Sequence, residues 1–296
     1  MPAVTLKYIL IEYFMLNNFS HLTLNTNFSL IMIFIIGSCI GSFLNVVIYR
    51  LPLMIKNEEY NLAIDFLEDT SPKITTKFNL SYPKSHCPKC KKSIPFWANI
   101  PILGYFITKM RCHYCHIHIP ARYPCVEFIT AGMFFTLGYI EANLLILTLG
   151  LIFISLLICI ILISYDKNPI PNILTCILLW IGVLVNIKFN FAGSLILSII
   201  GAVSGYIIIR LCCKILTTLN KNLKEENATA ILAAALGSWF GYFAMLKIII
   251  PATILFILYN LIFNKFKKLP LALFIGILGI IYLYYLNSQN IITLTF

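Results

Sequence analysis

Four cysteines form the pattern in this chain that most clearly points to chemistry. They come as two pairs, Cys87-Pro-Lys-Cys90 and Cys112-His-Tyr-Cys115. Two Cys-x-x-Cys pairs at this separation place four thiolates at the corners of a tetrahedron, as structural zinc requires. We expect a closed structural site, because a catalytic zinc normally keeps one position open for water. Two reduced pairs without metal, or a disulfide, are the alternatives.

The remaining cysteines and the nearby histidines are not expected to bind the metal. Six cysteines lie in or beside apolar runs, where cysteine usually serves as a small buried hydrophobe: Cys39, Cys125, Cys159, Cys176, Cys212 and Cys213. Four histidines crowd the two pairs: His86, His113, His116 and His118. Because four thiolates are available, we expect the histidines to face solvent or to support the ligands.

Composition places the cysteine pairs on a loop of a membrane protein. Hydrophobic residues make up 60% and charged residues 11% of the 296 residues, whereas soluble domains hold roughly a quarter charged residues. A membrane-spanning helix needs about 20 apolar residues. Suitable runs lie near 29–49, 126–140, 144–164, 170–186, 192–211, 229–245, 248–263 and 270–287. The sequence therefore predicts an all-α polytopic membrane protein with about eight transmembrane helices and a small zinc-binding loop domain.

The division of the chain follows from these runs. We expect an N-terminal segment with the first membrane helix at 1–52, a zinc-binding domain at 53–124 and a multi-helix membrane domain at 125–296. Residues 1–28 lack a small-residue cleavage site, so we expect no cleaved signal peptide.

Positive charges predict the orientation of the chain. With the N-terminus outside, nineteen of the 22 Lys and Arg residues lie on the inner side, eleven of them in residues 50–124. Cytoplasmic loops of membrane proteins carry such an excess of Lys and Arg. We therefore expect a multi-pass protein of the bacterial inner membrane with a cytoplasmic zinc loop. The net charge of +11 is explained by topology, and no nucleic-acid partner is expected.

Polar and small residues at the end of the first apolar run form a further motif. The run ends Gly41-Ser42-Phe43-Leu44-Asn45-Val46-Val47-Ile48-Tyr49-Arg50-Leu51-Pro52. Gly37 and Gly41 lie one helical turn apart, which favours close contact with a second helix. Asn45 is a polar group at membrane depth, and Arg50 and Pro52 mark the cytoplasmic exit.

Further motifs follow in order. They comprise Trp97-Ala98-Asn99-Ile100-Pro101, Arg122-Tyr123-Pro124-Cys125-Val126-Glu127, Ile170-Pro171-Asn172-Ile173-Leu174-Thr175 and Leu236-Gly237-Ser238-Trp239. Together with the first motif and the cysteine pairs, they resemble the bacterial type IV prepilin peptidase/N-methyltransferase family over about residues 29–245. Glu127 could pair with Arg122, which would be a structural role.

The resemblance implies a function and partners. Members of this family are membrane aspartic peptidases that remove the basic leader from type IV prepilins and type II pseudopilins. Many then methylate the new N-terminus with S-adenosylmethionine. By resemblance, the partners are prepilins or pseudopilins and the assembly proteins of a pilus or a type II secretion system.

Two family aspartates carry the proteolysis, and this chain departs at both. The first family position holds Ser164, and the second holds Thr229. The glycines before the second are replaced by Glu226 and Ala228, and Asp166 is the only aspartate after residue 69. Met110 replaces a glycine of the methylating members. An aspartic dyad needs two carboxylates that share a proton.

We therefore expect a family protein that is catalytically impaired. An active peptidase that uses the displaced acids Asp166 and Glu226 is one alternative. A non-catalytic, zinc-stapled membrane scaffold that binds pilins is another. A transporter is the weakest alternative, because only Asp166 offers a deep polar site. S-adenosylmethionine is expected as a cofactor only if methylation is retained.

Overall fold

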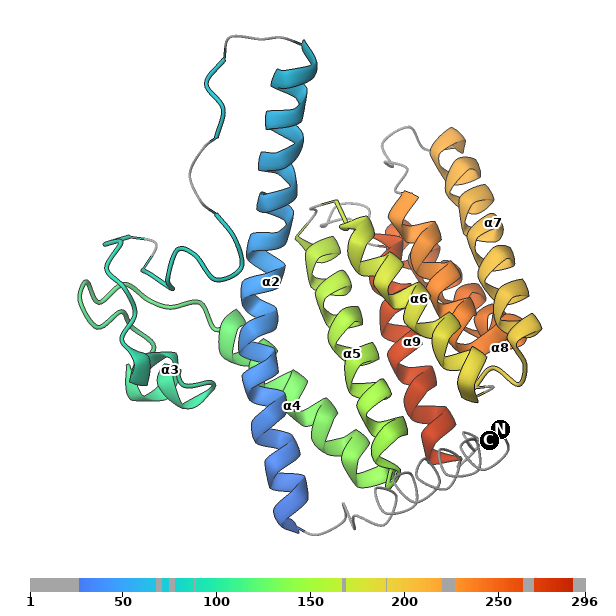
Figure 1. Ribbon diagram of the computed structural model, residues 1–296, viewed down its shortest axis with the longest axis horizontal. Helices are drawn as coiled ribbons and strands as arrows, with labels where there is room; N and C mark the ends of the chain where they lie inside the picture. The colour runs from blue at the N-terminus through green and yellow to red at the C-terminus, as the bar shows by residue number, and fades with distance from the viewer. Residues whose placement is uncertain are drawn as a thin grey trace, which may run out of the picture.

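The computed structural model describes residues 27–67, 71–74, 78–87, 89–166, 169–189, 191–219, 227–262 and 269–289. Within these residues, β pairing is limited to two isolated bridges. The long helices are α2 (Asn27–Leu67), α4 (Arg122–Ile140), α5 (Leu144–Tyr165), α6 (Asn172–Phe189), α7 (Leu195–Leu219), α8 (Asn227–Ile262) and α9 (Leu271–Ser288). The 3-10 helix η1 (Phe96–Asn99) and the short α3 (Leu103–Ile107) lie between α2 and α4 (Figure 1).

The predicted all-α membrane fold is confirmed. Seven helices in the described part of the chain are long and apolar enough to cross a membrane. About eight were expected, and the difference arises because the predicted spans 229–245 and 248–263 are joined in α8. This helix is bent at Gly241, whose φ of 79° and ψ of 178° are not helical. Glycine adopts a positive φ without the clash that a Cβ would cause, so the break falls at this residue, inside the span predicted at 229–245.

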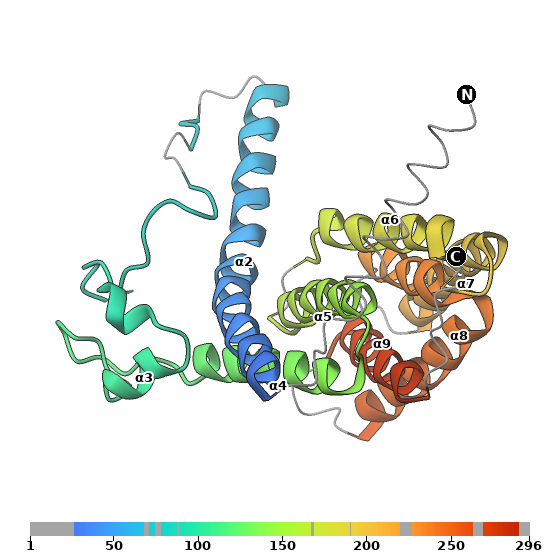
Figure 2. The same cartoon turned by 60° about the horizontal axis from the view of Figure 1, so that its bottom comes forward.

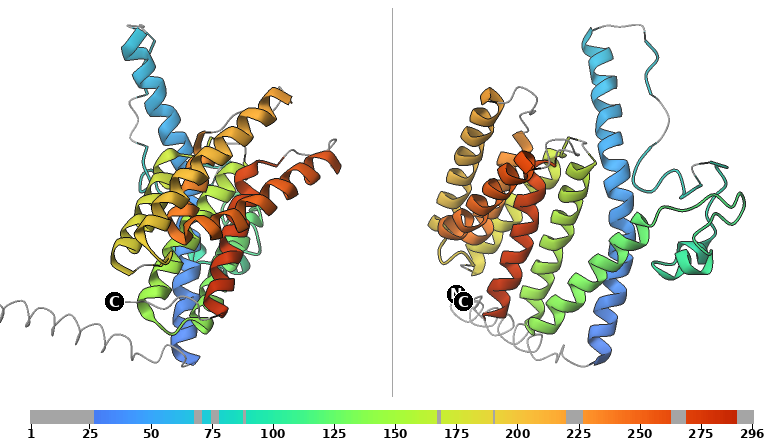
Figure 3. Two further views of the ribbon diagram at one scale, coloured as in Figure 1. Left: turned by 90° about the vertical axis from the view of Figure 1, so that its right-hand side faces the viewer. Right: turned by 180° about the vertical axis from the view of Figure 1, so that it is seen from behind.

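The two arms of α8 run in opposite directions along α9. In the first arm, Leu236 lies against Gly279 and the Phe240 ring is 5.4 Å from the Tyr282 ring. In the second arm, the Phe256 ring is 6.1 Å from that of Phe274, nearer the start of α9. The chain therefore advances along α9 before Gly241 and returns after it. The C-terminal helix α9 also lies beside α5, where Gly276 approaches Ile161 (Figure 3).

The break at Gly241 frees backbone carbonyls that buried side chains bind. The Ser238 carbonyl accepts hydrogen bonds from Asn186 Nδ2 at 2.8 Å and from Ser198 Oγ at 2.7 Å. Asn186 Nδ2 also reaches the Trp239 carbonyl at 3.3 Å. Asn186 and Ser198 are fully buried. Non-helical backbone at membrane depth persists only where the protein itself satisfies the polar groups, so these side chains stabilise the bend.

Glycines bring α2 and α4 into close contact, as predicted. A Cβ on Gly37 would lie 2.8 Å from the Ala131 Cα, and one on Gly41 would lie 2.8 Å from the Glu127 Cα. The two helices cross at this contact (Figure 2). A larger side chain at either position would push the helices apart. The contact places the first turns of α4 beside the middle of α2.

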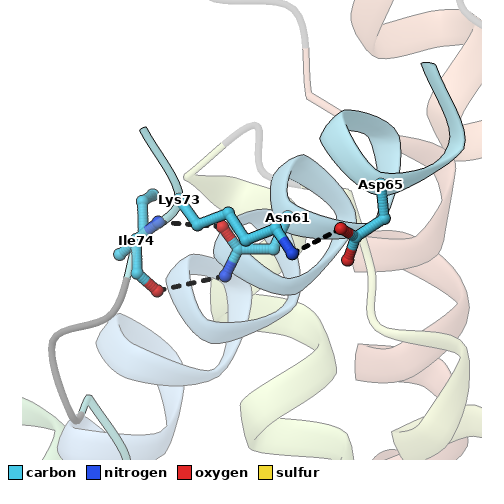
Figure 4. Close-up of polar contacts among 4 residues, drawn as sticks. All are labelled: Asn61, Asp65, Lys73 and Ile74. Carbon is cyan, nitrogen blue, oxygen red and sulfur yellow. Dashed lines mark hydrogen bonds and ion pairs between the residues drawn. The ribbon is translucent and has the colours of Figure 1, made fainter. Parts of the chain in front are cut away.

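Beyond the predicted span, α2 continues past Pro52 to Leu67. The stretch that follows it folds back along this extension. Asn61 exchanges two hydrogen bonds with the backbone of Ile74, at 2.9 Å and 3.1 Å, and Asp65 pairs with Lys73 (Figure 4). The extension thereby begins to guide the chain from α2 toward the cysteine cluster.

We predict that Asn186→Leu destabilises the protein. The substitution keeps the approximate volume but leaves the Ser238 and Trp239 carbonyls with fewer donors, and a buried group without a partner costs about 1–3 kcal/mol. Thermal unfolding of the detergent-solubilised protein measures the effect. The control is Asn260→Leu, because Asn260 Nδ2 binds a carbonyl of its own helix. An equal loss in both variants would contradict the assigned role of Asn186.

Candidate metal centre and the two acid positions

The four cysteines meet in space, although residues 91–111 separate the two pairs. Their Sγ atoms all lie within 4.8 Å of one another. The Cys87 and Cys115 sulfurs are 3.6 Å apart, and the Cys90 and Cys112 sulfurs are 4.0 Å apart. Zinc–sulfur bonds of about 2.3 Å in a tetrahedron place neighbouring sulfurs about 3.8 Å apart. The donor set and its spacing therefore fit one tetrahedral metal ion.

The same backbone turn shapes both cysteine pairs. The Lys91 N–H donates to the Cys87 carbonyl, and the His116 N–H donates to the Cys112 carbonyl, both at 3.0 Å. Lys91 and His116 have positive φ angles of 59° and 56°, which residues with side chains adopt rarely. The repeated turn directs both sulfurs of a pair toward one point.

Backbone N–H groups stabilise negative charge on the sulfurs unequally. The Cys90 N–H is the main reason that the pKa of Cys87 falls to about 6, although burial opposes it. The N–H groups of Cys115 and Tyr114 likewise lower the pKa of Cys112. For Cys115, the Ile117 N–H lowers the pKa, but burial and the neighbouring sulfurs outweigh it and raise the value to about 11. A bound divalent cation would let all four thiols lose their protons, and metal affinity would fall as pH falls.

The histidines of the loop make other contacts, as expected. The His113 ring lies 5.3 Å from the Trp97 ring and 5.1 Å from the Tyr114 ring. His86 and His118 contact main-chain carbonyls through Nδ1. In the described part of the chain, the four cysteines are the only cluster of three or more His, Cys, Asp or Glu side chains that could hold a metal ion.

Arg50 fastens the chain that leads to the cysteine cluster. Its guanidinium donates to the carbonyls of Asn79 at 2.9 Å, Leu80 at 3.2 Å and Pro83 at 2.6 Å. Its fixed fork of donors suits several carbonyls at once. Because Arg50 is itself buried, the motif arginine joins α2 to the segment that ends at the first cysteine pair.

Glu127 holds the other side of the loop. Its carboxylate accepts a 2.6 Å hydrogen bond from the Ile102 N–H, just before α3, and also contacts Ser42. Asn45 donates to the Tyr123 carbonyl at 3.1 Å. The expected Glu127–Arg122 pair is wrong, because Arg122 pairs elsewhere. The sequence did not predict the Ile102 contact, because every residue except proline has a backbone N–H and the residue type therefore does not reveal this donor.

Arg122 and Asp166 join the start of α4 to the end of α5. The guanidinium donates to both carboxylate oxygens, at 2.8 Å and 2.6 Å. This two-bond geometry is the strong form of an arginine–carboxylate pair. Both oxygens of the displaced acid are therefore bound to the same cation.

Ser164 and Thr229, which the sequence resemblance assigns to the two family aspartate positions, are both buried. Ser164 is 2% exposed and Thr229 is 3% exposed. The Ser164 Oγ has no hydrogen-bond partner among the described residues. Glu226, the candidate partner of Asp166, lies outside the described residues. The structure therefore shows hydroxyl groups at both buried positions.

The other motif residues lie at the boundaries of elements. Asn99 ends η1 and Pro101 follows shortly, while Pro171 directly precedes α6 and Asn172 is its first residue. Pro52 lies inside α2. These positions shape the backbone between the cysteine cluster and the membrane helices.

We predict one zinc ion per chain, held by the four cysteines. Replacing Cys87 and Cys115 together with serine should abolish stoichiometric zinc and expose the loop to protease, because binding energy becomes folding energy. Zinc content of the purified protein gives the result. Cys125→Ser is the control, because this exposed cysteine lies outside the cluster. Full zinc retention in the double variant would refute the assignment.

Comparison with known proteins identifies the family. The model of the bacterial peptidase A24 N-terminal domain matches residues 35–140. Three similar proteins are each named prepilin leader peptidase/N-methyltransferase. The Neisseria gonorrhoeae protein is 32% identical over 80% of this chain and 82% of its own length. The Aeromonas salmonicida protein is 36% identical over 72% and 74%, and the Legionella pneumophila protein is 28% identical over 88% and 93%.

No solved structure is significantly similar to the chain. The sequence similarity nevertheless spans the loop, the cysteine cluster and most of the membrane helices. Because identity above 30% extends over more than two thirds of both chains, this protein belongs to the prepilin leader peptidase/N-methyltransferase family.

Proposed function

We propose that this protein binds type IV prepilins or pseudopilins at the cytoplasmic membrane without removing their leader. The observation that carries this proposal is the pair of buried hydroxyl residues, Ser164 and Thr229, at the two acid positions. A hydroxyl group neither carries the negative charge nor shares the proton that an aspartic dyad uses to activate water. Pilus biogenesis and type II secretion are the settings that the family indicates.

The displaced acid does not supply the missing function in this proposal. Both oxygens of Asp166 accept hydrogen bonds from Arg122. A carboxylate that orients water must offer an oxygen to that water, and it must have a second acid nearby. Asp166 instead connects the end of α5 to the start of α4. We assign it a structural role.

We infer that the cysteine loop faces the cytoplasm. The C-terminal ends of α2, α5 and α7 point to the same side of the molecule (Figure 1). The stretches that follow these ends in sequence hold eleven of the 22 Lys and Arg residues, whereas residues 141–143 and 190–194, at the opposite ends of the helices, hold none. Such an excess accompanies cytoplasmic loops. A reducing cytoplasm also favours thiolates that bind metal over a disulfide.

Structural zinc completes the proposed scaffold. Four thiolates saturate a tetrahedral ion and leave no position for a reacting water. The ion would hold together a loop that the described structure ties to α2 through Arg50 and to α4 through Glu127. We assign it no part in proteolysis.

Methyl transfer is not part of the proposed function. Met110 has a positive φ of 62°, in the position where methylating members carry glycine. Glycine accepts this conformation without strain, so the backbone retains a shape that suits glycine while the side chain has changed. S-adenosylmethionine is therefore not proposed as a cofactor.

We predict that restoring one acid will not create a peptidase, whereas restoring both together with the glycines will. The variants are Ser164→Asp, Thr229→Asp, and a quadruple variant that adds Glu226→Gly and Ala228→Gly to both. Only the quadruple variant should remove the leader of a co-expressed type IV prepilin, because a proton-sharing pair needs both members. A gel shift of membrane-embedded prepilin reports cleavage.

The matched control carries asparagine in place of both new aspartates within the same glycine background. It preserves shape while removing the charge, so it should leave the leader intact. Cleavage by either single-acid variant would contradict the need for both positions. Failure of the quadruple variant, present in the membrane with full zinc content, would contradict a preserved peptidase scaffold.

Binding without cleavage has a separate readout. A tagged prepilin that retains its leader should co-purify with the unaltered chain from detergent-solubilised membranes. The same pilin without its leader is the control and should be recovered less efficiently. Equal recovery of both, or recovery of neither, would contradict leader-dependent binding.

A further inference from the structure

The segment that carries η1 and α3 exposes a cluster of large apolar side chains. Phe96 is 88% exposed, Leu103 and Phe106 are each 60% exposed, and Ile107 is 56% exposed. We call these four residues the η1–α3 face. Contiguous exposed apolar surface usually marks a site of contact with a protein or a membrane. The four residues occupy two short helices that follow each other closely in the chain.

The part of the sequence that carries this face is rich in cations and has no acidic residues. Residues 70–126 contain nine Lys and Arg and no Asp or Glu. Lys109 and Arg111 line a cavity of about 520 Å³, together with Trp97, His113 and His116. A surface that combines apolar side chains with unopposed positive charge complements anionic phospholipids at a membrane surface.

The position of the face brings it to the bilayer that surrounds α4. Figure 1 shows α3 level with the first half of α4, and Figure 2 shows it just past the start of that helix, at the side of the helix bundle. The hydrogen bond from the Ile102 N–H to Glu127 fixes the start of α3 to α4. Phe128 and Ile129, which follow Glu127 in α4, are 60% and 51% exposed. Lipid that contacts these residues would lie close to the η1–α3 face.

We propose that the η1–α3 face inserts into the interfacial layer of the bilayer and binds anionic phospholipids. The four apolar side chains lie among the upper acyl chains, and Lys109 and Arg111 bind lipid phosphates. The zinc loop is thereby held at the membrane surface, where a membrane-embedded partner protein would contact it. This proposal requires only that the chain spans a membrane and is independent of prepilin binding.

Fluorescence quenching by brominated lipids tests the proposal on the full-length protein. A Trp180→Phe variant in nanodiscs removes an exposed tryptophan on α6, while Trp239 is fully buried and provides a reference with little lipid contact. Trp97 adjoins Phe96 and should be quenched by phospholipids brominated near the headgroup. The quenching should disappear in the Trp97→Phe/Trp180→Phe variant.

Substitutions at the face provide the decisive comparison. In the Trp180→Phe background, Leu103→Asp with Phe106→Asp should abolish Trp97 quenching while one zinc per chain is retained. Leu62→Asp is the matched control, because Leu62 on the extension of α2 is also 60% exposed; it should leave the quenching unchanged. Lys109→Gln with Arg111→Gln should remove any enhancement by anionic lipid.

Three results would overturn the proposal. The first is equal quenching of Trp97 in the Trp180→Phe protein and in the same protein with Leu103→Asp and Phe106→Asp. The second is quenching that appears only when each nanodisc holds a single chain, which would indicate that a second copy otherwise covers the face. The third is quenching that is lost when prepilin is added, which would assign the face to a protein partner. If the Leu103→Asp/Phe106→Asp variant loses its zinc, the comparison is repeated with Phe106→Ser alone. Unchanged Trp97 quenching in that variant would also contradict the proposal.

Discussion

The cost of a backbone polar group without a partner in an apolar environment governs this structure. Each such group costs several kcal/mol inside a bilayer. Where the backbone departs from a regular helix, a side chain must therefore form a hydrogen bond with the N–H or carbonyl group that is left unpaired. Asn186 and Ser198 bind the carbonyls that the bend at Gly241 releases. Arg50 binds three carbonyls of the chain entering the cysteine loop, and Glu127 accepts the N–H of Ile102. Four buried polar residues, Asn186, Ser198, Arg50 and Glu127, thus stabilise irregular backbone.

The polar residues that stabilise the fold are different from the residues at the two proposed acid positions. The cysteine cluster, the glycine contact between α2 and α4, and the anchors of the loop form in a chain with Ser164 and Thr229 at the proposed acid positions. The loss of the dyad that we propose is therefore compatible with the family's fold. Asp166 illustrates the distinction, because its two bonds to Arg122 join α4 to α5 and give it a structural reason to be present.

Local patterns in the sequence were sufficient to predict much of this. The Cys-x-x-Cys spacing predicted the sulfur cluster, and long apolar runs predicted the helices, because both signals depend on near neighbours in the chain. Two separate spans, 229–245 and 248–263, were expected, but the break between the arms of α8 falls inside the first of them, at Gly241, where glycine accepts the positive φ. The expected Glu127–Arg122 pair failed because partners on different helices are set by packing. Nor could the sequence foresee Asn186 beneath the bend, although a lone asparagine in an apolar run is a detectable signal.

We propose that this chain keeps the scaffold of its family but lacks peptidase activity. Intact-mass measurement of a type IV prepilin, co-expressed with the unaltered chain and extracted from membranes, tests it most directly. The predicted mass is that of the pilin with its leader and without a methyl group. The pilin should have the same mass when it is co-expressed with the Asp166→Asn or Glu226→Gln variant of this chain. Quantitative conversion to the mature mass by the unaltered chain, lost in Asp166→Asn or Glu226→Gln, would show that the displaced acids cleave and would contradict the claim.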